Sequence, residues 1–258
     1  MGKIISVANQ KGGVGKTTTA VNLAACLGDA GKRVLLVDID PQGNASSGLG
    51  IGKKGLTGSS YEVLIGELSA DDAIRPSSAR NVDIMPSNIA LAGAELELCE
   101  LPNRAGRLRE AVKPLRHRYD FILIDCPPSL GMLTINAFAA SDSVLIPIQC
   151  EFYALEGLSQ LVNTLRQVKH TYNPKLEIEG VLFTMYDGRL ILTTQVADEV
   201  KRFFPGKVYK TAIPRNVRLS EAPSHGKAVI YYDGSSRGAA FYRAFTEELL
   251  EANGGKKR

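Results

Sequence analysis

The chain has 258 residues, of which 44% are hydrophobic and 22% charged, and these ordinary proportions exclude a disordered chain and a long coiled coil. The formal net charge of +4 is too small to indicate a nucleic-acid partner by itself. No apolar run approaches the roughly 18–20 residues of a membrane span, the first residues do not resemble a signal peptide, and the four cysteines form no Cys-x-x-Cys pair that would indicate a zinc site. We therefore expect a cytoplasmic protein with reduced thiols.

Short apolar runs rich in β-branched residues alternate with helical patterns along the chain. The predicted strands are Ile4–Asn9, Val34–Asp38, Val82–Met85, Phe121–Asp125, Val144–Pro147, Ile178–Thr184 and Val208–Ala212. The predicted helices are Lys16–Leu27, 90–100, 105–117, 131–140, 155–170, 191–204 and 236–252. Because most strand runs are apolar throughout, they predict strands that are covered on both faces. This order predicts one α/β domain over residues 1–253, with a doubly wound, mostly parallel sheet and helices on both faces.

Two segments lack these patterns. Gln42–Ser60 is rich in glycine and serine and predicts a mobile loop. Residues 254–258, Gly-Gly-Lys-Lys-Arg, predict a flexible basic tail. Ligands of a doubly wound sheet bind beyond the carboxyl ends of its strands, so motifs that carry function should directly follow strands.

A glycine-rich segment directly follows the first predicted strand and opens the first predicted helix. It consists of Lys11, Gly12, Gly13, Val14, Gly15, Lys16, Thr17 and Thr18. The strict P-loop pattern requires a glycine where this sequence has Gln10, but the glycines still let the backbone aim N–H groups at phosphate oxygens. Lys16 would neutralise the β- and γ-phosphates, the hydroxyl of Thr17 suits Mg²⁺, and Thr18 can donate to the α-phosphate. The segment therefore predicts a P-loop NTPase.

Aspartates follow two of the predicted strands. Asp125 ends a strand in the arrangement of a magnesium-binding Walker B carboxylate, and Asp40 follows the second strand, where it could position the attacking water or touch the metal. A strand-end aspartate can also be a helix N-cap or a turn residue. We predict that Asp40 and Asp125 serve the nucleotide site together with Thr17, and that Asp38 is a buried structural partner.

The Lys-Gly-Gly-x-Gly-Lys-Thr string resembles the deviant Walker A motif, which ParA and Soj partition ATPases share with MinD ATPases and the nitrogenase iron protein. Asp-x-Asp-Pro-Gln-Gly-Asn at 38–44 resembles the partition-ATPase switch region, and similar blocks follow at 147–157, 184–189 and 213–224. The resemblance is to the chromosomal-type ParA/Soj family and spans roughly residues 3–230.

The resemblance implies ATP and Mg²⁺ as cofactors and an ATP-dependent homodimer that sandwiches the nucleotides. Lys11 would reach the partner subunit's phosphates and act in catalysis with Lys16 and Asp40, while Pro214 and Asn216 would lie against the adenine. A ParB-type partner would stimulate a slow hydrolysis and release the protein from DNA. Because the glycine-rich segment begins at residue 11, we expect no helix-turn-helix before it, and so non-specific binding of double-stranded DNA and association with the nucleoid.

Positive charge concentrates between residues 189 and 227, where eight basic and three acidic residues give a net charge of +5. Such a segment can bind phosphate backbones or can simply be a solvated surface. The resemblance implies that Arg189 and Arg218 contact DNA.

Two alternative functions would use the same nucleotide site but would bind a membrane or an iron–sulfur cluster in place of DNA. A MinD-like membrane ATPase needs a basic amphipathic C-terminal helix, but the last predicted helix carries Phe241, Phe245 and Leu249 on one stripe beside an acidic polar face, which favours docking on the core and no stable membrane association. An iron–sulfur reductase needs two thiolates per subunit at the dimer axis, for which only Cys99 and Cys126 come into question.

Overall fold

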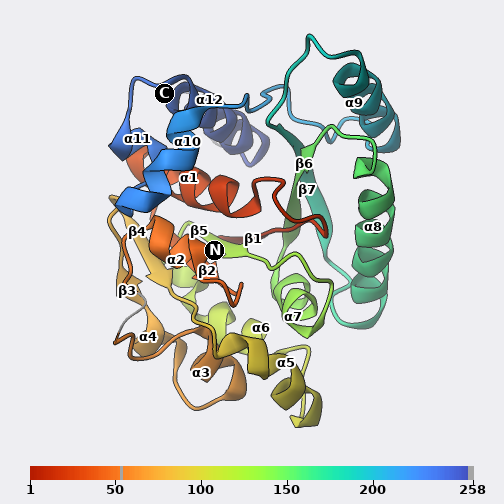
Figure 1. Ribbon diagram of the computed structural model, residues 1–258. Coiled ribbons are helices and arrows are strands. Elements are labelled where there is room, and N and C mark those ends of the chain that lie inside the picture. The colour runs from red at the N-terminus through yellow and green to blue at the C-terminus, as the bar shows by residue number, and fades with distance from the viewer. Residues whose placement is uncertain (53–54, 255–258) are drawn as a thin grey trace.

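The computed structural model describes residues 1–52 and 55–254 and confirms the predicted α/β fold (Figure 1). Within these residues seven strands form one sheet in the order β3-β4-β2-β5-β1-β6-β7, and all neighbours are parallel except β3 and β4. The strands are β1 (Lys3–Val7), β2 (Val34–Asp38), β3 (Arg75–Pro76), β4 (Val82–Met85), β5 (Phe121–Asp125), β6 (Ser143–Gln149) and β7 (Glu177–Thr184).

Helices cover both faces of this sheet (Figure 1). They are α1 (Lys16–Asp29), α2 (Asn44–Gly48), α3 (Ser60–Ile65), α4 (Ala70–Ala73), α5 (Leu91–Glu100), α6 (Arg107–Val112), α7 (Met132–Ala140), α8 (Ala154–Thr171), α9 (Ile191–Phe203), α10 (Val217–Glu221), α11 (Val229–Tyr232) and α12 (Arg237–Ala252). Two short 3-10 helices, η1 (Lys113–His117) and η2 (Ala222–His225), complete the set. The helices predicted at 90–100, 131–140, 155–170, 191–204 and 236–252 are thus confirmed to within a residue or two at each end.

The two faces of the sheet bury separate hydrophobic cores, because successive side chains of a strand point to opposite faces. Ile4 packs in the core under α3 and α5–α9, whereas its neighbour Ile5 packs in the core under α1, α11 and α12. Leu35 and Leu36 divide between the same two cores. The prediction that strands with apolar residues throughout are covered on both faces is therefore confirmed.

Parallel pairing aligns the carboxyl ends of the central strands. Asp125 at the end of β5 lies opposite Val7 at the end of β1 and opposite Asp38 at the end of β2. The glycine-rich segment begins just after Val7, so the register alone places it beside both aspartates.

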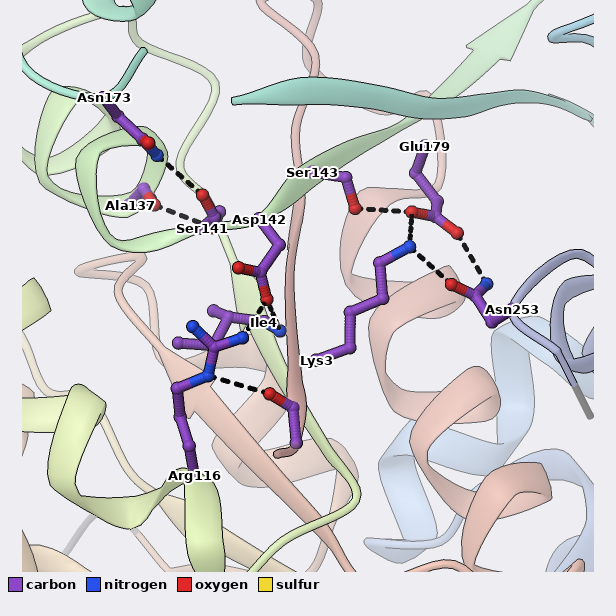
Figure 2. Close-up of polar contacts among 11 residues, drawn as sticks. Lys3, Ile4, Arg116, Ala137, Ser141, Asp142, Ser143, Asn173, Glu179 and Asn253 are labelled. Atoms are coloured by element: carbon purple, nitrogen blue, oxygen red, sulfur yellow. Dashed lines mark hydrogen bonds and ion pairs between the residues drawn. The ribbon is translucent and has the colours of Figure 1, made fainter. Parts of the chain in front are cut away.

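The amino ends of the strands carry a polar network at the opposite edge of the sheet (Figure 2). The ammonium group of Lys3 lies 2.5 Å from Oε2 of Glu179 and also donates to the side chain of Asn253, which follows α12. Glu179 accepts a further hydrogen bond from Ser143, and its side chain is only 4% exposed. Burial tends to raise the pKa of Glu179, but these donors outweigh it and lower the pKa. The network fastens α12 to β1, β6 and β7.

Two of the secondary-structure elements predicted from the sequence are wrong. Among the described residues, Val208–Ala212 forms one isolated bridge to β7 instead of a strand. The amide groups of Lys210 and Thr211 donate to the carboxylate of Glu248 in α12, at 2.7 and 3.0 Å, and therefore cannot extend the ladder. The helix predicted at 105–117 changes to the 3-10 helix η1 after Val112, just before Pro114.

The predicted Gln42–Ser60 loop is also wrong in part, because it contains α2 and the first residue of α3. Ser59 caps α3 in a capping box with Glu62, which is a signal that the sequence itself carries. The short elements α4, β3, α10 and α11 were not predicted. The predicted tail at 254–258 falls outside the described residues apart from Gly254, and the domain boundary at 253 stays a prediction.

One glycine allows a close approach of α1 to the sheet, and this leads to a stability prediction. A Cβ atom on Gly28 would lie 2.1 Å from the carbonyl oxygen of Arg80, so Gly28→Ala forces backbone to move. We expect it to lower the free energy of unfolding by about 1–3 kcal/mol, as overpacking does. Gly157→Ala in α8 is the matched control, because a Cβ there meets nothing within 4 Å and should stabilise the helix by about 1 kcal/mol. Urea unfolding of both variants measures the difference, and an equal effect would contradict the packing argument.

Candidate nucleotide-binding site

The glycine-rich segment turns sharply between β1 and α1. Gly13 and Gly15 have φ of 73° and 82°, a region that residues with a Cβ atom rarely adopt. A Cβ on Gly12 or Gly13 would meet no atom within 4 Å, so this part of the turn is open. The turn ends at the N-terminus of α1, whose unpaired N–H groups and positive dipole end favour a phosphate. The segment thus has the geometry of a phosphate-binding loop.

Lys16 is the buried cation of this loop. It is 7% exposed, and its Nζ donates to the carbonyl oxygen of Lys11 at 2.9 Å. Burial lowers the pKa of Lys16, and the nearby charges of Asp125 and Asp40 act in the opposite direction. Burying an ammonium group costs free energy unless a negative charge lies nearby. The site therefore favours the binding of an anion.

Lys11 and Val14 take different places in the same loop. The Nζ of Lys11 lies 2.5 Å from Oε2 of Glu151, and both side chains are partly exposed, at 33% and 46%. Val14 is buried, and its carbonyl oxygen accepts a hydrogen bond of 2.8 Å from the hydroxyl of Thr184 at the end of β7. Val14 therefore contributes backbone to the loop, and its side chain packs inside the protein.

Three aspartates lie beside the loop in different environments. Asp38 is buried and accepts hydrogen bonds from the amide and hydroxyl of Ser46, at 2.8 and 2.7 Å, which confirms it as a structural partner. Burial raises the pKa of Asp38 to about 6 despite these donors. Asp40 is 7% exposed, and its Oδ1 accepts from the amide of Gln42 at 2.9 Å.

Asp125 is the least satisfied of these carboxyl groups. It is fully buried, and neither of its oxygens has a hydrogen-bond partner among the described residues. Burial raises the pKa of Asp125 well above its usual range, and the negative charge of Asp38 raises it further, while the nearby Thr17 and Lys16 act in the opposite direction. A buried carboxyl group without a partner points to a ligand that the chain itself does not supply.

Magnesium fits this donor set. Mg²⁺ takes oxygen ligands and is usually held by one or two carboxylates together with water and substrate phosphates. Thr17 and Asp125 can supply oxygens, with Asp40 nearby. Within residues 1–52 and 55–254, no group of three or more His, Cys, Asp or Glu side chains is placed to hold a metal alone. An ion here would therefore also need oxygens from a bound nucleotide.

A cavity of about 750 Å³ opens from the loop. The predicted residues that line it are Gly12, Gly13, Gly15, Lys16, Thr17, Thr18, Asp40, Pro214 and Asn216. Further residues that line it were not predicted as site residues, and these are Gln42, Asn44, Pro128, Thr184, Met185, Ile213, Arg215, Val217, Leu219, Ser220, Pro223 and Tyr242. The phosphate loop and the 213–223 segment thus line one and the same cavity.

Two of these unpredicted residues lie at the carboxyl end of a predicted strand, where ligands of a doubly wound sheet are expected. Thr184 ends β7 on the same edge as the loop, and Met185 directly after it has a φ of 49°, which is rare for a residue with a side chain. The 213–223 segment is held there by the bridge between Tyr186 and Pro214 and by the hydrogen bond from the amide of Ile213 to the carbonyl oxygen of Phe183. The local sequence does not predict these contacts.

Arg189 and Arg218 lie outside the nucleotide cavity. The side chain of Arg189 is 89% exposed and is paired with Asp187, with Nη2 and Nε at 2.6 and 2.8 Å from the two carboxylate oxygens. Arg218 is half-exposed and lies between Glu221 and Asp233, at 2.8 and 3.1 Å. The structure therefore places both arginines on the surface, each next to carboxylates of its own chain.

The membrane-bound alternative depends on the last helix, and the iron–sulfur alternative depends on Cys99 and Cys126. The structure places neither set of residues as the alternative function would need. Phe245 and Leu249 of α12 are fully buried in the core, as expected for a helix that docks on the sheet. Each described helix is too short or too polar to span a bilayer. Cys126 is fully buried, and burial raises the pKa of its thiol, whereas Cys99 is exposed. Cys126 thus lies in the core, away from the surface on which a shared cluster would need its thiolate.

Comparison with known proteins agrees with this site. A family model described as an AAA domain matches residues 2–178. The chain is 59% identical over 254 residues to the sporulation initiation inhibitor protein Soj of Bacillus subtilis, covering 98% of this chain and all of that protein. It is 53% identical to the chromosome partitioning protein ParA of Myxococcus xanthus, covering 97% and 89%, and 48% identical to the chromosome-partitioning ATPase Soj of Treponema pallidum, covering 98% and 99%.

Solved structures show the same fold, and one of them holds a nucleotide analogue. A cobyrinic acid a,c-diamide synthase from Mycobacterium smegmatis with bound ATP analogue and magnesium is 37% identical, with a TM-score of 0.85 over 97% of this chain and 95% of that chain. The cell division ATPase MinD of Pyrococcus furiosus is 29% identical, with a TM-score of 0.81 over 97% and 99%. The phosphate loop, the aspartates beside it and this similarity over nearly the whole length lead to one assignment: the chain belongs to the ParA/Soj family of chromosome-partitioning ATPases.

Proposed function

We propose that the chain is an ATP-dependent DNA-partitioning ATPase, in which ATP binding drives a dimer that binds DNA without sequence preference and a ParB-type partner stimulates hydrolysis and release. The observation that supports the nucleotide part is Asp125, a fully buried carboxyl group beside the phosphate loop whose oxygens have no hydrogen-bond partner in the part of the chain that the structure describes. A nucleotide with magnesium, as in the similar M. smegmatis structure, would meet this group and the buried Lys16 together.

Each side chain of the site has a distinct proposed task. The loop amides and Lys16 bind the phosphates, and Thr17 and Asp125 hold the Mg²⁺ ion, which supplies neutralisation of phosphate charge when bound. Asp40 orients the attacking water or assists at the metal, and Pro214 and Asn216 lie against the adenine at the other part of the cavity. Because phosphoryl transfer depends on positioning and charge neutralisation, no nucleophilic side chain is required.

Lys11 supports the proposed dimer. Its side chain is partly exposed, and its ammonium group pairs with Glu151 of the same chain. In the proposed dimer, Lys11 exchanges this carboxylate for the phosphates of the nucleotide in the partner subunit. An exposed ion pair is worth at most about 1 kcal/mol, so such an exchange is not prevented by Glu151.

DNA binding is proposed on the surface that carries Arg189 and Arg218. Both side chains are exposed and lie in the segment with a net charge of +5. Contacts to phosphates give affinity that depends on salt and not on sequence. Dimer formation would double the number of such contacts, and this would make DNA binding depend on ATP and place the protein on the nucleoid.

The proposed cycle predicts different effects of Asp40→Ala on hydrolysis and on DNA binding. Asp40 lines the cavity and is not among the proposed DNA contacts. We expect the variant to hydrolyse ATP at least about tenfold more slowly, as loss of a catalytic proton acceptor or water-positioning group does, and still to bind duplex DNA in ATP. Binding is measured for both proteins with ADP, ATP and a non-hydrolysable ATP analogue. Equal DNA affinity of the wild-type chain in ADP and in the analogue would contradict the proposed cycle.

A further inference from the structure

The segment that leads from α9 toward α10 is held to β7 at two points. The amide of Tyr209 donates to the carbonyl oxygen of Val181 at 3.0 Å, and the amide of Ile213 donates to that of Phe183 at 2.8 Å. In a regular parallel ladder, amides two residues apart meet carbonyl oxygens two residues apart. Here the two carbonyl oxygens are two residues apart and the two amides are four residues apart, so the segment contains two extra residues. They lie in a bulge at 210–212.

Glu248 of α12 holds this bulge. Its two carboxylate oxygens accept hydrogen bonds from the amides of Lys210 and Thr211, at 2.7 and 3.0 Å. Amides of neighbouring residues point to opposite sides of a regular strand, so two neighbouring amides that meet one carboxylate show that the backbone turns away from β7. In a regular ladder, the amide of Thr211 would instead meet the carbonyl oxygen of Phe183.

Open space lies beside the bulge. Lys210, Thr211 and Ala212 line a second cavity, of about 1100 Å³, on the outside of the nucleotide site. The backbone of the bulge can therefore move without displacing the hydrophobic core on this side. The carboxylate of Glu248 is thus the contact that opposes such a movement.

The position of Glu248 is itself fixed by contacts elsewhere in α12 and just after it. The hydroxyl of Tyr242 lies 3.1 Å from that of Thr19 in α1. Asn253 accepts a hydrogen bond from Lys3 of β1 (Figure 2). The phosphate loop lies between β1 and α1, so α12 places Glu248, and with it the bulge, relative to the phosphate loop.

The bulge determines which residues line the nucleotide cavity. Ile213, Pro214 and Asn216 come directly after it, and all three line the cavity. A slip of two residues leaves every side chain on its own face, because side chains alternate with a period of two. If the amide of Thr211 took the place of that of Ile213 at Phe183, Pro214 and Asn216 would move two residues along the cavity wall.

We propose that Glu248 is a positioning residue for the nucleotide. It keeps the two extra residues in the bulge and so holds Pro214 and Asn216 in the register in which they lie against the adenine. This role rests on the proposed function, because the adenine contacts are part of that proposal. Glu248 itself does not line the nucleotide cavity and acts only through the backbone of the bulge.

The test compares the affinity for ADP with the affinity for pyrophosphate, both with magnesium, because pyrophosphate has the phosphates of ADP without its adenine. For Glu248→Ala we expect ADP affinity to fall at least about tenfold, the result when about a tenth of the chains keep the competent register. Pyrophosphate affinity should stay within about twofold, since the phosphate loop is unchanged. Glu247→Ala is the matched control, because this glutamate is the exposed neighbour in α12, and both affinities should stay within about twofold.

A deletion separates control of the register from general support of the fold. Removing residues 210–211 from the Glu248→Ala chain places Ile213 two residues after Tyr209, as a regular ladder requires. We expect this shorter chain to recover ADP affinity to within about threefold of the wild-type value, because the competent register is then the regular one. A role of Glu248 in stability alone would not be replaced by shortening the segment.

Thermal unfolding of each variant shows which of them are folded. If Glu248→Ala unfolds, Glu248→Gln keeps one acceptor oxygen and should show a smaller loss of ADP affinity with the same unchanged pyrophosphate affinity. Wild-type ADP affinity in the folded variant, an equal loss for ADP and pyrophosphate, or no recovery on deletion would each overturn this inference alone. A wild-type chain that binds neither ADP nor ATP would overturn the proposed function and this inference with it.

Discussion

Lys16→Ala is expected to lower ATP hydrolysis at least about 100-fold, the scale on which removal of one preorganised charge donor acts. Lys16 is the buried cation of the phosphate loop, and its ammonium group donates to the carbonyl oxygen of Lys11. The charge of Asp125 acts to raise the pKa of Lys16. Without it, the phosphates would meet two buried acidic groups with no compensating charge, so nucleotide affinity should fall as well.

Initial rates of phosphate release and the affinity for ATP measure both parts of this prediction. Lys175→Ala is the control, because this lysine is exposed at the end of the chain segment that follows α8 and lines neither cavity. Hydrolysis by Lys16→Ala within a few fold of the wild-type rate would show that the reaction does not use this loop.

Tyr242→Ala is expected to lower the free energy of unfolding by about 3–5 kcal/mol, as other large-to-small changes in cores do. Tyr242 is 1% exposed in the core between α1 and α12, and its hydroxyl lies 3.1 Å from the hydroxyl of Thr19. The change would leave a cavity at the helix pair that supports the phosphate loop. Urea midpoints of the wild-type and variant chains measure the loss.

Two further tyrosine variants show which part of the side chain matters. Tyr242→Phe keeps the ring and removes the hydroxyl, so it should cost only about 1 kcal/mol. Tyr172→Ala removes a ring that is 40% exposed and should change the midpoint little. Equal losses for Tyr242→Ala and Tyr172→Ala would contradict the proposed packing role.

Local signals in the sequence were sufficient to predict the fold class and the phosphate loop. The apolar runs of β1, β2 and β5 are buried on both faces, and the glycines of the loop adopt the backbone conformations that only glycine favours. Each signal depends on neighbours in the chain, so a single sequence can carry it. The residues that the structure brings to the loop from β7 and beyond depend on pairing across the sheet.

The 213–223 segment illustrates this limit. Pro214 and Asn216 were assigned through resemblance, and they do line the cavity. Thr184 and Met185 line it too but were not predicted, although Thr184 donates a hydrogen bond to the phosphate loop. The hydrogen bond from Thr184 to Val14 joins residues 170 positions apart. Likewise, Val208–Ala212 has the composition of a strand, and only the carboxylate of Glu248 explains why it is not one.

The polar network at the amino ends of the strands has a consequence for biosynthesis. Asn253, which Lys3 contacts, is made 250 residues later, which at about 5–20 residues per second is a delay of roughly 10–50 s. Until then α12 cannot dock, and Leu23 and the other apolar residues of α1 lack the part of their core that α12 supplies. The growing chain should therefore be a good client for a chaperone that binds apolar segments, until its last helix has left the ribosome.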